Sequence, residues 1–323
     1  MKFQTLLAAL ALTTATTEAA SIAKRASRTS APAGCLTVGS GGIYSTIASA
    51  LSALGSGSST ACIYIAAGTY KEQLTINYPG NLTIYGQTTD TGSYKQNTVT
   101  ITHTISSPTA GSLINSATVN VAKDVFRMYN INIANGYGQG AQAVAASVSG
   151  DKIGFYGCKF TGYQDTLYAR AGTQYYSNCY IEGAVDYIFG AASAWYGECD
   201  IVSVGGGAIT AMSRETNDGT WYAFDHCNVK GGSGLDLAQD VYLGRPWRVL
   251  ARVIYQNSAL SNIINPKGWT TMAEGATPLY YEINNSGDGA GTSSRLYESQ
   301  ISAAVDKTTV LGSGWTAWID RTY

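Results

Sequence analysis

The sequence of 323 residues is poor in charge and in histidine. Charged residues make up only 13%, the formal net charge is −1, and no run of Lys or Arg occurs. Nucleic-acid binding depends on basic patches, so that function class is excluded. Only His103 and His226 are histidines, and no His/Cys cluster has zinc-ligand spacing, so we predict no metal and no cofactor. We expect His103 on a surface strand and His226 within a repeat.

Long hydrophobic runs are also missing. A membrane-spanning helix needs about 20 apolar residues, whereas the run Leu6–Leu12 is far shorter. With Lys2 before it and small residues after it, this run is typical of a secretory signal peptide. The pair Lys24-Arg25 is a candidate pro-peptide cleavage site. We therefore predict a secreted, extracellular protein that does not bind membranes.

The expected domain boundary follows from that leader. We predict a signal peptide with a possible short pro-segment over 1–25 and a single domain over 26–323. The triplets at Asn81 and Asn284 fit the N-glycosylation pattern, which is compatible with a secreted protein.

What the sequence does have is a repeat. It contains 37 Gly, 23 Tyr and 45% hydrophobic residues, which favours many short strands and turns. Four cysteines share one frame, with an aromatic residue three positions before and an apolar residue two positions after. These stretches are "FYGCKFTG" (155–162), "YSNCYIEG" (176–183), "YGECDIVS" (196–203) and "FDHCNVKG" (224–231).

The frame extends to "MYNINI" (128–133) and "YQNSAL" (255–260), which gives anchors at 131, 158, 179, 199, 227 and 258. Units of roughly 20–30 residues built from short alternating strands indicate a solenoid. We predict a right-handed parallel β-helix in which Cys158, Phe160 and their counterparts stack inside. The rival is a β-sandwich, but its hairpin turns do not recur regularly here.

Helices and disulfides would complete such a solenoid. Apolar residues at helical spacing within 41–57 predict an N-terminal capping helix, and 293–307 is a second candidate near the other end. Cys35 and Cys62 are a candidate disulfide pair. The four frame cysteines could also pair between adjacent coils, but we favour free, buried thiols.

Two aspartates occupy the same position on successive coils. Asp165 lies seven residues after Cys158, and Asp186 lies seven after Cys179. Because adjacent parallel strands are about 4.8 Å apart, we expect the two carboxyl groups to face each other. Like charges this close do not ionise together, so one carboxyl group holds a proton and the other is an anion. The alternative is a pair of turn residues that cap backbone N–H groups.

The motifs around these aspartates resemble the pectin methylesterases, in particular the fungal type. They are "QAVA" (142–145), "GYQDTLY" (162–168), "VDYIFG" (185–190) and "YLGRPW" (242–247), with "GTYKE" (68–72) and "GW" (268–269) also fitting. They occur in family order, and the resemblance runs from about residue 34 to 320. It implies an enzyme that hydrolyses methyl esters on galacturonate units of pectin and releases methanol.

The resemblance also implies catalytic roles. Asp186 corresponds to the nucleophile, and Asp165 to the general acid that later activates water. Gln142 and Gln164 correspond to amide donors for the developing oxyanion. Arg245 corresponds to the arginine that hydrogen-bonds the nucleophile.

Further residues are expected to bind the sugar. Trp247 and Trp269 resemble substrate platforms; the alternative for Trp247 is core packing beside Pro246. Tyr163 is expected to line the cleft, as is Met212, which stands where many plant members carry Gln. Thr69 of "GTYKE" completes the predicted set. The expected partner is the pectin polysaccharide, and the chain is expected to be a monomer.

Four other functions are alternatives to this one. Polygalacturonases are also β-helices that act on pectin, and carboxyl groups about 5 Å apart would fit a retaining glycosidase. Pectate lyases usually need Ca²⁺ and clustered Asp ligands, which the sequence lacks. A non-enzymatic polysaccharide-binding β-helix would leave the paired aspartates and Arg245 without a role. A serine esterase is disfavoured because G-x-S-x-G is absent.

The expected chemistry needs no metal, so we predict full methanol release from pectin in the presence of EDTA. The measurement compares initial rates before and after exhaustive chelation. A large loss of rate that added Ca²⁺ restores would contradict this mechanism.

Overall fold

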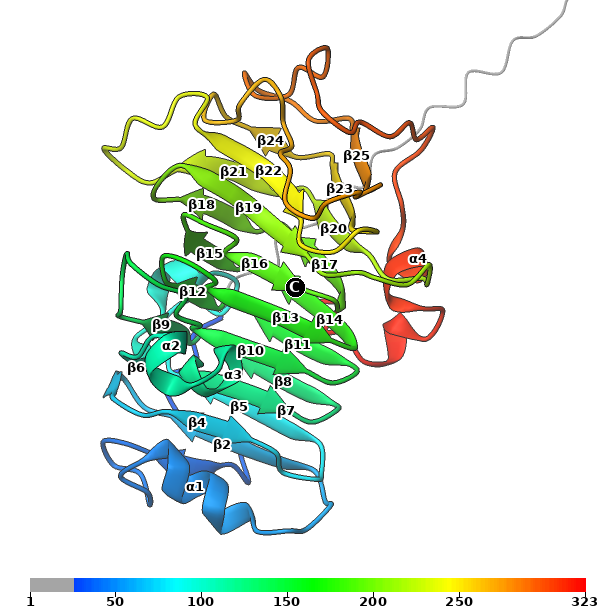
Figure 1. The fold of residues 1–323 in the computed structure, drawn as a ribbon. Helices are drawn as coiled ribbons and strands as arrows, with labels where there is room; N and C mark the ends of the chain where they lie inside the picture. Colours follow the sequence, from blue (N-terminus) through cyan, green and yellow to red (C-terminus); the bar gives the residue numbers. More distant parts are fainter. Residues whose placement is uncertain (1–25) are drawn as a thin grey trace, which may run out of the picture.

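The computed structural model describes residues 26–323 and shows a right-handed parallel β-helix (Figure 1). The predicted signal peptide and the Lys24-Arg25 pair lie outside the described residues. Every strand pairing between named strands is parallel, as a solenoid requires. The rival sandwich is thereby excluded, because sandwiches are built from antiparallel pairs.

Three sheets run along the axis. The ten-stranded sheet contains β1 (Leu36–Val38), β2 (Ala61–Ile65), β5 (Leu82–Gly86), β8 (Phe126–Tyr129), β11 (Ile153–Tyr156), β14 (Thr173–Ser177), β17 (Ser193–Gly197), β20 (Tyr222–Asp225), β23 (Arg252–Gln256) and β25 (Leu279–Ile283). The seven-stranded sheet contains β4 (Leu74–Ile76), β7 (Val119–Ala122), β10 (Ala146–Ser149), β13 (Leu167–Ala171), β16 (Ile188–Gly190), β19 (Gly207–Met212) and β22 (Val241–Pro246). The eight-stranded sheet contains β3 (Gly68–Tyr70), β6 (Val99–His103), β9 (Asn132–Asn135), β12 (Lys159–Thr161), β15 (Tyr180–Gly183), β18 (Asp200–Ser203), β21 (Asn228–Gly231) and β24 (Ala259–Leu260).

The repeat frame corresponds to columns of buried side chains inside the solenoid. The aromatic position stacks from coil to coil, with ring centroids 4.4–5.3 Å apart along Phe155, Tyr176, Tyr196, Phe224 and Tyr255. The cysteine position forms a parallel column in which each thiol donates to a carbonyl oxygen of the preceding coil at 3.3–3.6 Å. Stacked aromatic pairs and buried apolar area hold one coil on the next. The predicted inward orientation is confirmed.

The residue before each anchor turns the chain between two sheets. Asn130, Gly157, Asn178, Glu198, His226 and Asn257 all have φ between 51° and 58°. This left-handed conformation suits Gly and Asn and explains why they recur at the position. His226 is therefore a residue of the repeat, as predicted, and its exposed ring pairs with Asp225. His103 ends strand β6 and is half-buried.

A short helix covers the first coils. Helix α1 (Ile47–Leu54) lies within the predicted range and buries Ile47 and Ala50; Figure 1 shows it at one end of the solenoid. The carboxylate of Glu72 accepts the N–H groups of Ile47 and Ala48, both at 2.9 Å. Anions at a helix N-terminus satisfy its free donors and the helix dipole. The glutamate of "GTYKE" therefore joins the cap to the solenoid.

The predicted helix over 293–307 is wrong. Its backbone instead contacts the last coils, where the N–H of Leu296 donates to the Lys267 carbonyl and that of Ser299 to the Tyr280 carbonyl. Only Lys307–Leu311 is helical (α4), and it packs against β17 on the side of the solenoid, not over its end. Non-local pairing outweighs helix propensity here.

The remaining helical turns are short. Helices α2 (Ser107–Ala110) and α3 (Leu113–Ser116) lie beside the seven-stranded sheet in Figure 1, and the 3₁₀ turns are η1 (Tyr94–Gln96) and η2 (Trp315–Ala317).

The C-terminal segment, residues 305–323, runs back along the outer face of the ten-stranded sheet. Val310, Leu311, Trp318 and Ile319 pack on Tyr129, Tyr156, Tyr175 and Trp195. The hydroxyl of Tyr323 donates to the carbonyl of Thr91 and lies 3.4 Å from Oδ1 of Asn130. From the other end of the described chain, Arg28 donates to the same Asn130 oxygen at 3.1 Å. Both ends therefore meet on one coil.

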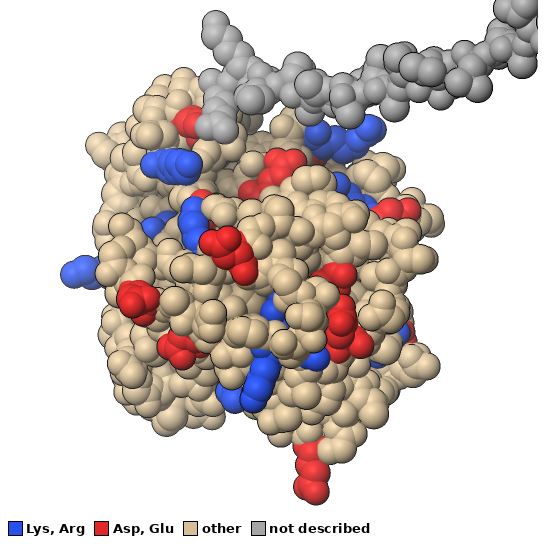
Figure 2. Space-filling model, turned by 90° about the horizontal axis from the view of Figure 1, so that it is seen from above, with Lys and Arg blue, Asp and Glu red and all other residues tan. Residues whose placement is uncertain are grey.

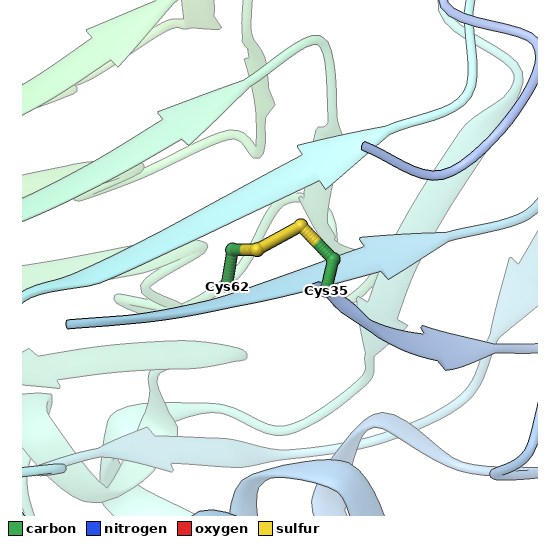
Figure 3. Close-up of a disulfide and its surroundings, with 2 residues drawn as sticks. All are labelled: Cys35 and Cys62. Carbon is green, nitrogen blue, oxygen red and sulfur yellow. A yellow bond between two sulfur atoms is a disulfide. The ribbon is translucent and has the colours of Figure 1, made fainter. Parts of the chain in front are cut away.

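One disulfide joins Cys35 and Cys62 (Figure 3), as predicted, and ties β2 to the segment that leads into β1. The four frame cysteines are free and buried. The favoured interpretation is confirmed, and burial raises the pKa of the Cys179, Cys199 and Cys227 thiols well above the usual range. Buried neutral thiols of this kind are chemically inert.

The contact between Glu72 and α1 gives a prediction about stability. Replacing Glu72 with Ala leaves two helix N–H groups without their carboxylate, so we expect a loss of about 1–2 kcal/mol in the free energy of unfolding. Denaturant unfolding measures it. The control is Glu274→Ala, at an exposed glutamate with no hydrogen bond or ion pair among residues 26–323. Equal unfolding midpoints for the two variants would contradict the proposed cap.

Candidate active site

A pocket of about 180 Å³ opens on the outer face of the seven-stranded sheet. All the predicted catalytic residues line it together with one predicted platform. The full lining is Leu113, Gln142, Gln164, Asp165, Asp186, Phe189, Ala211, Arg245, Trp247 and Met272. Concave sites with a few converging polar groups and apolar walls are the usual form of a ligand site.

The two aspartates lie on successive coils at the turns that lead into β13 and β16. Gln164 and Val185 form a parallel bridge, and the N–H of Asp165 donates to the Val185 carbonyl at 3.0 Å. Asp165 has φ 65° and Asp186 has φ 50°. Such left-handed backbone is costly outside glycine, and it clusters at functional sites. Both side chains are buried, because each residue is only 6% exposed.

Arg245 clamps one of the two carboxylates. Its Nε donates to Oδ1 of Asp186 at 2.8 Å, and its Nη2 donates to Oδ2 at 2.6 Å. This bidentate geometry is the strongest form of a charge-assisted hydrogen bond. The contact with Asp186 also raises the pKa of Arg245, so the guanidinium stays charged. Arg245 thus orients the carboxylate of Asp186 and serves as its counter-ion.

Asp165 has a different environment. Burial and, second, the charge of Asp186 raise the pKa of Asp165 to about 8, while Arg245 acts in the opposite direction. No hydrogen bond to its carboxyl group occurs among residues 26–323, so capping of turn N–H groups does not account for this residue. The raised pKa of Asp165, beside an Asp186 that is bound by Arg245, is compatible with the acid role predicted for Asp165 from the sequence.

Two amide side chains lie beside the aspartates. Gln142 and Gln164 come from adjacent coils, because the N–H of Ala143 donates to the Gln164 carbonyl at 3.0 Å. Both line the pocket, and neither side chain has a hydrogen-bond partner within the described part of the chain. Amide N–H groups without partners at such a place can donate to a substrate oxygen.

Aromatic rings form the adjoining wall. Tyr168 and Phe189 stack with centroids 4.4 Å apart, and Trp247 lies 5.9 Å from Phe189. Trp247 therefore faces the pocket, although it also packs on the apolar cluster of Phe189 and Ala211. Flat apolar rings of this kind suit the C–H faces of a sugar.

Four pocket residues were not predicted from the sequence. Phe189 and Ala211 could have been found, because Phe189 pairs with Ala211 and Ala211 pairs with Arg245 across adjacent strands. Leu113 comes from α3, and Met272, which is 43% exposed, comes from a loop after the last strand of the sheet. No repeat pattern covers those two segments.

The structure overturns two predicted substrate contacts. Trp269 is fully buried, stacks on Tyr280 at 4.0 Å and donates its indole N–H to Glu282 at 3.1 Å. It is a core residue, not a platform. Met212 is also fully buried, because side chains alternate along β19 and its neighbour Ala211 points into the pocket instead.

Two other predicted residues lie outside the pocket lining. Thr69 is on β3, an edge strand of the eight-stranded sheet, so it is on another face of the solenoid. Tyr163 is half-buried with its ring over Gly205, and its carbonyl accepts the N–H of Ala184. The structure therefore assigns neither residue to the wall of the pocket.

Charge on the surface is sparse and mixed. Seen along the axis from the end of the last coils, acidic and basic side chains are interspersed among uncharged ones (Figure 2). Within residues 26–323, no group of three or more His, Cys, Asp or Glu residues could hold a metal ion. That part of the chain also contains no helix long and apolar enough to cross a membrane.

Comparison with known proteins finds one family. The family model described as pectinesterase matches residues 36–320. Pectinesterase A of Emericella nidulans is 76% identical over 301 residues, which cover 93% of each chain. A crystal structure of the pectin methylesterase from Aspergillus niger, which carries an N-acetylglucosamine stub on one asparagine, matches with TM-score 0.92 and 74% identity over 92% of this chain and 100% of that one. The pectin methylesterase from carrot matches with TM-score 0.80 and 29% identity, over 89% and 97% of the two chains.

The raised pKa of Asp165 gives a prediction about stability. An unfolded Asp titrates near pH 4, so the proton that stabilises folded Asp165 is lost as the pH rises through about 8. The folded wild-type chain therefore loses stability between about pH 4 and 8. Asp165→Asn removes this dependence. The stability of this variant relative to the wild type should therefore rise with pH and stay constant above about pH 8.

Thermal unfolding midpoints of the two proteins from pH 5 to 9 measure this difference. Asp288→Asn, at an exposed aspartate, is the control and should run parallel to the wild type. A constant offset between wild type and Asp165→Asn at every pH would show that Asp165 is not protonated in the folded state.

Proposed function

The chain belongs to the pectinesterase family, and from this premise we propose that it hydrolyses methyl esters on the galacturonate units of pectin, with Asp186 as nucleophile and Asp165 as general acid and base. The members of this family are carboxylic ester hydrolases. The observation that carries the assignment of roles is the bidentate contact of Arg245 with Asp186 beside a raised pKa at Asp165.

The first step is the attack of Asp186 on the ester. A carboxylate oxygen of Asp186 bonds to the carbonyl carbon, and the electron pair of the C=O bond moves to its oxygen. Gln142 and Gln164 donate amide N–H groups to this oxyanion. Donors of this type typically contribute about 3–4 kcal/mol each to transition-state stabilisation.

The second step releases methanol. The bond between the carbonyl carbon and the methoxy oxygen breaks, and the protonated carboxyl group of Asp165 gives its proton to that oxygen. The products are methanol and an anhydride between Asp186 and the galacturonyl group. A group with pKa near 8 is protonated at neutral pH and is still a competent acid.

The third step regenerates the enzyme. Asp165, now a carboxylate, takes a proton from water, and the hydroxide adds to the galacturonyl carbonyl of the anhydride. The C–O bond to Asp186 breaks, which releases the galacturonic acid unit and restores the protonated Asp165 and the carboxylate of Asp186. Arg245 supports each step because it fixes Asp186 and keeps a positive charge beside it.

The substrate needs a surface beside this machinery. Trp247 and Phe189 supply an apolar wall next to Asp165 and Asp186, so we assign them to packing against the sugar ring. No observation favours the glycosidase or the binding-protein alternative over the esterase.

We further propose that the protein is secreted and glycosylated. Asn81 and Asn284 are both exposed, and the A. niger relative carries a glycan stub at an asparagine. Asn81 lies directly before β5.

The test measures two products from fully methylated homogalacturonan. We expect methanol without new reducing ends, and a kcat that falls as the pH rises through about 8 because Asp165 loses its proton. Asp186→Asn, which keeps the size of the side chain, should reduce kcat at least about a thousandfold. The exposed control Asp288→Asn should be unaffected. New reducing ends without methanol would show that the protein is a glycosidase and not an esterase.

A further inference from the structure

Arg248 directly follows Trp247, which lines the pocket. Its guanidinium carbon lies 5.6 Å from the centroid of the Trp247 ring, and its Nε lies 2.7 Å from Oε1 of Glu215. The Arg248 side chain is 49% exposed and that of Glu215 is 63% exposed. An ion pair of this kind lies in solvent beside a wall of the site.

The backbone that carries this pair is fixed. The N–H of Arg248 donates to the Met212 carbonyl, and the N–H of Leu250 donates to the Arg214 carbonyl at 3.1 Å. The side chain of Arg214 is itself buried and hydrogen-bonded to Asp218 and to the Leu250 carbonyl. These hydrogen bonds tie the segment that carries Arg248 to the segment that carries Glu215, so the two side chains are presented next to each other.

The guanidinium groups of Arg245 and Arg248 differ in how many of their N–H donors already have a partner. Arg245 places two donors on Asp186 and is the cation among the described pocket residues. Arg248 uses Nε for Glu215, and its two terminal amino groups have no partner among residues 26–323. A guanidinium has five donors in a planar fork that matches a carboxylate. Arg248 therefore retains the capacity to bind a second carboxylate.

The substrate class supplies such a group. Galacturonate units whose ester has already been removed carry free carboxylates, and they are neighbours of esterified units on the same chain. An exposed ion pair contributes little to stability, so an incoming carboxylate can displace Glu215 easily. An arginine with this partner can therefore distinguish a charged neighbour from a methylated one.

We propose that Arg248 is a specificity-determining residue that binds a free galacturonate carboxylate next to the ester under attack, and that Glu215 competes for the same guanidinium. This inference rests on the proposed esterase function. Under it, Arg248 favours partly de-esterified pectin, and Glu215 limits the size of that preference.

The test uses oligogalacturonides of one length, either fully methylated or about half methylated. The measured quantity is the ratio of kcat/KM on the half-methylated to that on the fully methylated substrate, from initial methanol release. Arg248→Gln should lower this ratio about tenfold, mainly through KM on the half-methylated substrate. Arg248→Lys should restore part of it, and Glu215→Gln should raise it several-fold.

Salt and a matched control separate this role from general effects. Higher ionic strength should shrink the wild-type preference, because the contact is exposed. Lys230→Gln removes another exposed cation, paired with Asp200 on the eight-stranded sheet, and should leave the ratio unchanged.

The outcomes distinguish this inference from the function on which it rests. If all variants are active but Arg248→Gln changes kcat/KM equally on both substrates, or on neither, only the proposed role of Arg248 is overturned. A wild-type chain that releases no methanol from either substrate overturns the esterase proposal and this inference with it. If Arg248→Gln fails to fold, an unchanged ratio in Glu215→Gln overturns the competition.

Discussion

The parallel pairing of each coil with the next is the constraint on which the molecule depends. It stacks the rings of Tyr176, Tyr196 and Phe224 inside, and the same register brings Asp165 above Asp186 outside. Shifting one coil by a single residue would turn its side chains to the opposite face. Core packing and the geometry of the aspartate pair are therefore one property of the fold.

The site departs from what stability alone would favour. Two aspartates adopt left-handed backbone and are almost fully buried, and burial raises the pKa of Asp165 to about 8. Arg245 compensates for the charge of Asp186 only. The neighbouring coils supply the rest of the free energy through backbone ladders and stacked rings. A repetitive scaffold thus tolerates a locally unfavourable pair, because parallel strand pairing on three sheets holds the coils around it.

The sequence predicted what repeats and what lies on the repeat. The cysteine frame gave the β-helix, the inward columns and the positions of Asp165 and Asp186. It did not predict features that depend on non-local contacts: Trp269 is enclosed by Glu282 and Tyr280, and 293–307 pairs with earlier coils instead of forming a helix. The prediction for Met212 was wrong by one position, since the alternation of side chains along β19 directs Ala211 to the pocket. Leu113 and Met272 come from segments outside the frame.

The junction at Asn130 has a practical consequence. Arg28 and Tyr323 meet there on the ten-stranded sheet, whereas the pocket opens on the seven-stranded sheet. A linker fused after Tyr323 would leave the molecule from a different side than the one a polymer approaches. Such a fusion could anchor the protein to a bead or resin with its pocket still directed toward the solution.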